Sequence, residues 1–230
     1  EQVVKHLLAN AANARALVSQ TCDTMGVVVG DVADPFFGAL VKGVAAVAVE
    51  QGLHLLMGNG FHRAQQEREA IELLIGKRCE ALVVHSKALG DEELVDYALR
   101  APGMVLINRD IPSLRGRCIA LNNRQGAATA TRHLLDLGHR HIAFLSSDHA
   151  IEDALLRHQG YQDALAEAEV FADPELVESG MPNEEGGERA MLNLLAKGLP
   201  ITAVVAYNDA MAAGAISVLA DNGLKVPEEV

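Results

Sequence analysis

The stretch MGVVVGDVADPFF, residues 25–37, decides the fold. It passes from a β-branched apolar run through a short polar turn to the start of a helical pattern, which predicts a first strand followed at once by a first helix. Asp34 suits the N-cap of that helix, and Pro35 suits its first turn, where the missing N–H has no partner to lose.

Two adjacent phenylalanines, Phe36 and Phe37, follow this turn in a chain with only 3% aromatic residues. Ligands bind at the carboxyl ends of strands in open parallel sheets, and a ring placed there can stack on a sugar or a base. Large apolar side chains at the start of a helix also commonly pack into the core beneath it. The spacing alone leaves both roles open.

Composition and charge restrict the class of protein. A chain of 230 residues with 50% hydrophobic content can form one large or two medium domains. No apolar run has the length of a membrane span, and the N-terminus lacks the layout of a secretory signal. The net charge of −12 argues against nucleic-acid binding by this chain itself. Cys22, Cys79 and Cys118 have neither disulfide nor zinc-site spacing, so the cytoplasm is the expected compartment.

Strand and helix patterns alternate along nearly the whole chain. This alternation is typical of βαβ units with parallel sheets and right-handed crossovers, so the fold class is α/β with two doubly wound parallel-sheet lobes. The expected elements are a helix over 1–20; strands over 25–30, 53–58, 80–85, 103–108 and 118–121 with helices over 36–52, 64–77 and 90–99; and helices over 124–137, 152–168, 185–197 and 209–222 with strands over 141–146, 175–179 and 202–206.

The alternation predicts a boundary near residue 121, because a single sheet of about nine strands is less common than two smaller ones. Residues 24–121 are expected to form a first lobe and residues 122–230 a second, preceded by a helical segment over 1–20. A cleft between two such lobes is the expected ligand site. Since no strand follows the last predicted helix, we expect the second sheet to lack its C-terminal strands.

Several tempting catalytic and metal-binding patterns fail on spacing. His133, His139 and His141 fit no standard zinc motif. The consecutive residues 146–149, Ser-Ser-Asp-His, cannot take the geometry of a hydrolytic triad, and no G-x-S-x-G elbow is present. The Gly-Asn-Gly at 58–60 lacks the third glycine of a dinucleotide site. We therefore expect neither an enzyme nor a resident metal or cofactor.

Polar side chains recur at the carboxyl ends of the predicted strands. Amides, carboxylates and an arginine that meet in one cleft suit a polyhydroxylated ligand, because each hydroxyl both donates and accepts. An N-cap for the next helix is an equally good explanation for any one of them, and Asp209 is predicted to be such a cap. Arg157, inside a predicted helix, is expected by default to be solvated. The residues concerned are Asp31, Asp34, Asn59, His85, Ser86, Asn108, Arg109, Ser147, Asp148, Asn208 and Asp209.

Five motifs give the chain a resemblance to the lactose-repressor family of bacterial transcription regulators. They are Asn13-Ala14-Arg15-Ala16-Leu17 and the segments over 25–38, 102–109, 137–143 and 202–215. The segments over 71–75 and 78–87 are most similar to the branch of that family that regulates galactose operons.

The resemblance implies a type I periplasmic-binding-protein-like domain that binds a sugar effector, galactose or a related hexose, between its lobes. It also implies a homodimer, and a further ligand aspartate on a strand beyond Val230. By matching motif, the ligand-binding residues implied are Asp31, Phe36, Phe37, Asn108, Arg157, Met181 and Asn208.

The resemblance further implies operator DNA as a partner. Family members combine a helix-turn-helix in the major groove with a hinge helix whose leucine enters the minor groove. Asn13, Arg15 and Leu17 match that hinge, although Leu7-Leu8-Ala9-Asn10 replaces the usual Gly-Tyr-x-Pro before it. The sequence thus favours a sugar-responsive repressor. The alternative is a periplasmic sugar-binding protein of a transporter, which would be a monomer without a hinge helix.

Overall fold

The computed structural model describes residues 23–230. These residues divide into two compact units, with the boundary between Leu121 and Asn122. The predicted helix over 1–20, with the hinge residues Asn13, Arg15 and Leu17, lies outside the described residues.

The first unit contains a five-stranded, fully parallel sheet in the order β2-β1-β3-β4-β5. The register pairs Val28 of β1 with Gly58 of β2 and with Val84 of β3, so the three strands end at the same edge. The elements are β1 (Thr24–Val29), α2 (Pro35–Glu50), β2 (His54–Asn59), α3 (Ala64–Gly76), β3 (Ala81–His85), α4 (Asp91–Arg100), β4 (Met104–Ile107), the 3₁₀-helix η1 (Pro112–Leu114) and β5 (Cys118–Ile119).

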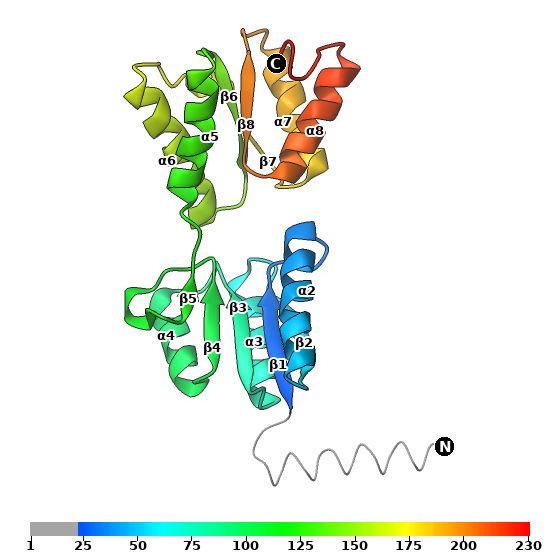
Figure 1. The fold of residues 1–230 in the computed structure, drawn as a ribbon, viewed down its shortest axis with the longest axis vertical. Coiled ribbons are helices and arrows are strands. Elements are labelled where there is room, and N and C mark those ends of the chain that lie inside the picture. Colours follow the sequence, from blue (N-terminus) through cyan, green and yellow to red (C-terminus); the bar gives the residue numbers. More distant parts are fainter. Residues whose placement is uncertain (1–22) are drawn as a thin grey trace, which may run out of the picture. The chain divides into compact units, whose positions relative to one another are not determined.

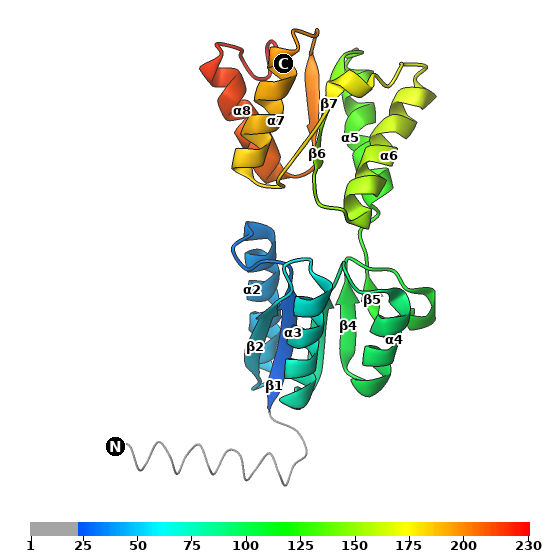
Figure 2. The same cartoon turned by 180° about the vertical axis from the view of Figure 1, so that it is seen from behind.

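Helices cover both faces of this sheet, because the buried strand residues are apolar on both sides. Val27 and Val29 pack with Phe37 of α2 on one face. Val28 packs with residues of α3 and α4, among them Ile71 and Leu94, and these two helices lie on the other face of the sheet (Figure 2). A central strand buried on both faces accounts for the continuous valine run of β1.

The second unit contains a parallel three-stranded sheet in the order β7-β6-β8. α5 and α6 lie together on one face, and α7 and α8 lie together on the other (Figure 1). The elements are α5 (Asn123–Asp136), β6 (Ile142–Ser147), α6 (Glu152–Glu167), the 3₁₀-helix η2 (Pro174–Leu176), β7 (Val177–Gly180), α7 (Glu184–Ala196), β8 (Ala203–Ala206) and α8 (Asp209–Asp221).

The predicted α/β class with parallel sheets is confirmed, and every predicted element from residue 25 onward forms within about two residues of its expected bounds. One local error has a clear physical cause: the strand expected over 175–179 begins only at Val177. The Asp173 carboxylate accepts a hydrogen bond from the Glu175 N–H at 2.9 Å and starts a 3₁₀ turn there instead. An Asp-Pro pair favours such a turn over a strand.

Among residues 23–230, no helix is both long enough and apolar enough to cross a membrane.

Two glycines let the helix pairs of the second unit approach closely. A Cβ on Gly214 of α8 would lie 2.1 Å from the Glu184 carbonyl oxygen of α7. A Cβ on Gly160 of α6 would lie 2.0 Å from the Arg124 carbonyl oxygen of α5. Both obstacles are backbone atoms, so a side chain here can be accommodated only if the helices separate.

We therefore expect Gly214→Ala to lower the free energy of unfolding by about 1–3 kcal/mol, the cost of overpacking a close backbone contact. Gly126→Ala is the matched control, since a Cβ on this helical glycine would meet nothing within 4 Å. The control should gain about 0.5–1 kcal/mol from helix propensity. Urea unfolding of both variants tests this, and equal stabilities would contradict the close-contact explanation.

Candidate functional site

Side-chain oxygens hold the turn between β1 and α2. The Asp34 carboxylate accepts a hydrogen bond from the Phe36 N–H at 2.8 Å, so the predicted N-cap is confirmed. Asp31 accepts from the Ala33 N–H at 2.9 Å, and Asn59 at the end of β2 accepts from the Val32 N–H at 3.2 Å. The turn before the phenylalanines is thus held both by its own aspartates and by Asn59 of β2.

The structure separates the two roles that the sequence left open for the phenylalanines. Phe37 is 5% exposed and belongs to the core under α2, whereas Phe36 is 47% exposed. The two rings meet edge to face, with centroids 5.1 Å apart. Phe36 therefore offers the accessible ring, and Phe37 supports it from beneath.

Phe37 also contacts two imidazoles that the sequence analysis did not bring together. Its ring centroid lies 4.7 Å from that of His85 at the end of β3, and the His62 and His85 centroids are 5.5 Å apart. His85 is only 3% exposed, and its Nδ1 has no hydrogen-bond partner among the described residues. Burial, then the nearby His62 and Lys87, lowers the pKa of His85 to about 3. The imidazole is therefore neutral at physiological pH.

Glu67 of α3 is a buried carboxylate that sequence reasoning assigned to a helix and otherwise missed. It is 1% exposed and receives the Ser86 hydroxyl at 2.5 Å. Its two oxygens also accept three consecutive backbone N–H groups, from Lys87 at 3.1 Å, Ala88 at 3.1 Å and Leu89 at 3.2 Å. One side chain thereby anchors the whole loop between β3 and α4.

Asn108, at the end of β4, has a left-handed backbone with φ of 54°. Its N–H donates to the Ile119 carbonyl at 2.7 Å, and its own carbonyl accepts from the Lys87 ammonium. Within the part of the chain that the structure describes, its side-chain amide makes no hydrogen bond. The backbone of Asn108 is therefore held while its amide stays available to a ligand.

Arg109 is committed to the loop that Glu67 anchors. Its guanidinium donates to the Asp91 carboxylate at 2.6 Å and to the Leu89 carbonyl at 3.1 Å. Only 15% of its side chain is exposed, so this arginine secures α4 and the loop before it.

In the second unit, Arg157 is half-buried rather than solvated. Its Nε donates to the Asn123 side-chain oxygen at 2.9 Å, and its Nη1 donates to the Tyr207 carbonyl. Its guanidinium also lies over the Tyr207 ring, 4.4 Å from the centroid. The default expectation for Arg157 is therefore wrong: the start of α5 and the end of β8 orient this side chain.

Asn208 is the N-cap of α8, so the prediction that Asp209 caps this helix is wrong by one residue. The Asn208 side-chain oxygen accepts from the Met211 N–H at 2.9 Å, and its Nδ2 donates to the Pro182 carbonyl at 2.8 Å. Pro182 follows Met181, whose side chain is 43% exposed. Asn208 therefore fixes the turn that presents Met181.

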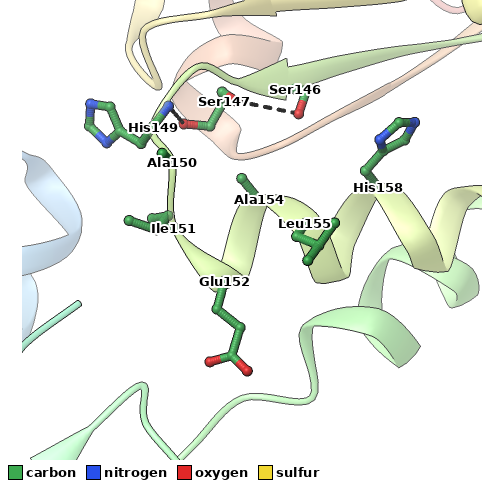
Figure 3. Close-up of a pocket in the computed structure, with 9 residues that line it drawn as sticks. All are labelled: Ser146, Ser147, His149, Ala150, Ile151, Glu152, Ala154, Leu155 and His158. Carbon is green, nitrogen blue, oxygen red and sulfur yellow. Dashed lines mark hydrogen bonds between the residues drawn. The ribbon is translucent and has the colours of Figure 1, made fainter. Parts of the chain in front are cut away.

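A cavity of about 460 Å³ lies in the second unit where β6 passes into α6 (Figure 3). The His149 N–H donates to the Ser147 hydroxyl oxygen at 3.1 Å and shapes the loop at its edge. Neither Arg157 nor Asn208 lines this cavity. The lining residues are Ser146, Ser147, His149, Ala150, Ile151, Glu152, Ala154, Leu155 and His158.

Residues 23–230 contain no cluster of three or more His, Cys, Asp or Glu side chains placed to hold a metal ion. His139, which drew attention in the sequence, instead lies 3.0 Å from the Thr202 hydroxyl through its Nδ1. That contact links the connection after α5 to the residue before β8.

A family model described as periplasmic binding proteins and sugar binding domain of LacI family matches residues 22–230. The chain belongs to this family. The resemblance inferred from the motifs is therefore confirmed, and with it the type I periplasmic-binding-protein-like fold.

Relatives of this LacI-family chain are transcription regulators. It is 57% identical over 219 residues to the HTH-type transcriptional regulator GalR of Escherichia coli, a match that covers 95% of this chain and 64% of GalR. It is 52% identical over 216 residues to GalS of Salmonella typhimurium, covering 94% of this chain and 64% of GalS. The crystal structure of the Escherichia coli transcriptional repressor ascG is 31% identical with a TM-score of 0.80, covering 90% of this chain and 76% of that one. The chain thus spans 64% of the length of these curated relatives.

Replacement of Glu67 by glutamine should destabilise the first unit of this LacI-family chain. An amide oxygen accepts fewer hydrogen bonds than a carboxylate, and its NH₂ group faces backbone donors, so we expect a loss of about 1–3 kcal/mol in unfolding free energy. Glu69→Gln is the matched control, because Glu69 is an exposed glutamate on the same helix. Thermal and urea unfolding measure both variants; a Glu67→Gln protein as stable as the control would contradict the anchoring role.

His85 should make stability depend on pH. Its folded pKa of about 3 lies below the ordinary value of 6.5, so between these values the unfolded chain binds a proton that the folded chain does not. This contribution is complete above about pH 6.5, and we expect it to fall by about 1.4 kcal/mol for each pH unit below that.

His85→Asn removes the titrating ring. Between about pH 4 and 6, the unfolding free energy should therefore depend on pH less steeply, by about 1.4 kcal/mol per pH unit, which is the contribution of one proton. Gln51→Ala, at an exposed residue with no titratable group, is the control and should leave the slope as in the unchanged protein. Urea unfolding at several pH values measures the slopes. Identical slopes for all three proteins would refute this prediction.

Proposed function

We propose that this chain is the effector-binding region of a sugar-responsive transcriptional repressor, and that galactose or a related hexose is the effector. The main support is the identity of 57% with the regulator GalR across 95% of the chain. The relatives are transcription regulators rather than transport proteins or enzymes, which favours the repressor over the periplasmic alternative.

The chemistry of the predicted site residues suits a sugar. In the first unit, Phe36 supplies an exposed ring for the C–H face of a pyranose, and the amide of Asn108 can both donate to and accept from one hydroxyl. Asp31 lies in the same turn as Phe36 and offers a carboxylate for a further hydroxyl. Phe37 acts in this proposal by supporting Phe36.

In the second unit, Arg157 is the principal ligand contact that we propose. Its planar guanidinium can donate two parallel hydrogen bonds to neighbouring hydroxyls, and its contacts with Asn123 and Tyr207 limit its freedom before a sugar arrives. Met181 contributes apolar surface. Asn208 holds the Met181 turn through the Pro182 carbonyl, and it contacts the effector from that position.

The proposed response to sugar follows from linkage. A sugar can release operator DNA only as far as it binds the DNA-free arrangement of a homodimer more tightly, which requires about 1–3 kcal/mol or more of coupling. DNA contact by Asn13, Arg15 and Leu17 belongs to this proposal, as does a cytoplasmic location. The charge of −12 supports a phosphate-binding surface that lies outside the bulk of this chain.

Calorimetry with a panel of hexoses on the full-length protein tests the effector. We expect galactose or a close relative to release heat, and we expect Asn108→Gly and Arg157→Lys each to weaken binding at least about tenfold, as for a lost charge-assisted or bidentate contact. Glycine at 108 removes the amide while tolerating the left-handed backbone.

Arg189→Ala is the matched control, since Arg189 is exposed on α7 of the same unit and should bind sugar as the unchanged protein does. Absence of heat with every hexose would remove the effector proposal. Unchanged affinity in both Asn108→Gly and Arg157→Lys would instead reject the proposed site and leave the effector in place.

A further inference from the structure

We propose that Lys87 is a positioning residue for the effector: it directs the amide of Asn108 without touching the sugar, and Glu67 keeps Lys87 in place. This inference rests on the proposed function of Asn108 as a sugar contact. The observation behind it is the hydrogen bond from the Lys87 ammonium to the main-chain carbonyl of Asn108.

The direction of the Asn108 side chain depends on an unusual backbone. A φ of 54° lies in the left-handed region, which non-glycine residues adopt uncommonly, although asparagine does so more readily than most, and main-chain contacts help to hold it there. The Asn108 N–H is held by Ile119 of β5 and its carbonyl is held by Lys87. Without the Lys87 contact, one of the two restraints on this backbone disappears.

The position of Lys87 depends in turn on Glu67. The carboxylate of this helix residue accepts the N–H of Lys87 and the N–H groups of the next two residues. Because Glu67 is 1% exposed and Ser86 is also 1% exposed, water competes little for these bonds. The loop that carries Lys87 is therefore bound to α3 before any ligand arrives.

Arg109 adds a second link between the same two segments. Its guanidinium donates to the Leu89 carbonyl of the loop, while its own backbone adjoins Asn108. The end of β4 and the loop after β3 are thus joined by two cations. Lys87 donates to the main-chain carbonyl of Asn108, and this is the contact through which it acts on the amide.

The test is galactose calorimetry on the full-length protein carrying Lys87→Met, Lys87→Arg, Asn108→Gly or the pair Lys87→Met with Asn108→Gly. We expect Lys87→Met to raise Kd about tenfold, the effect of losing one charge-assisted hydrogen bond. Lys87→Arg retains a cationic donor and should stay within about threefold of the unchanged protein. Lys77→Met, at an exposed lysine that follows α3 in the same unit, should have no effect.

The double variant separates positioning from a general loss of structure. If Lys87 acts only through Asn108, Lys87→Met should change Kd no further once the amide is gone. Full additivity of the two changes overturns the proposal, and so does an unaltered Kd in Lys87→Met when Asn108→Gly binds weakly. An Asn108→Gly protein that binds as the unchanged protein does refutes the proposed site itself, and the positioning role falls with it.

Discussion

The buried carboxylate of Glu67 is the constraint on which the first unit depends at the carboxyl edge of its sheet. A charged group that is 1% exposed is tolerated only when hydrogen bonds replace its water, and here a hydroxyl and three backbone N–H groups do so. The same bonds satisfy loop donors that the end of a strand leaves without partners. The loop N–H groups thus replace the water that the carboxylate loses on burial, and the carboxylate accepts the hydrogen bonds that these N–H groups would otherwise lack.

Both units use a cation on a main-chain carbonyl to order a strand end. Lys87 donates to the carbonyl of Asn108 after β4, and Arg157 donates to the carbonyl of Tyr207 after β8. The two cations differ in shape: the guanidinium of Arg157 presents its donors in a planar fork, whereas the ammonium of Lys87 is a compact charge. In the proposed function, Arg157 therefore serves structure and ligand together, while Lys87 acts on Asn108.

The α/β alternation was predictable because strand and helix periods differ along the chain, and the N-cap at Asp34 was predictable because its signal is local. The sequence did not show which of Phe36 and Phe37 is buried. Burial at the start of a helix depends on how the helix packs on the sheet, and this packing buries Phe37 and leaves Phe36 exposed. Glu67 was missed for a related reason: in a polar helix its sequence context is the same as that of its exposed neighbour Glu69. Its burial comes from a loop about twenty residues away, and periodicity carries no information on such a contact.

A loop that is ordered before its ligand arrives lowers the entropic cost of binding. Ligands that must order a flexible loop lose part of their contact energy to conformational entropy. In the proposed site, Glu67 already fixes the β3–α4 loop, and Asn123 and the Tyr207 ring already hold the guanidinium of Arg157, which would reduce that loss. Under the proposed function, such pre-ordering raises the affinity for sugar. It shifts an equilibrium between two arrangements of the protein only where the strand ends are ordered in one arrangement and not in the other.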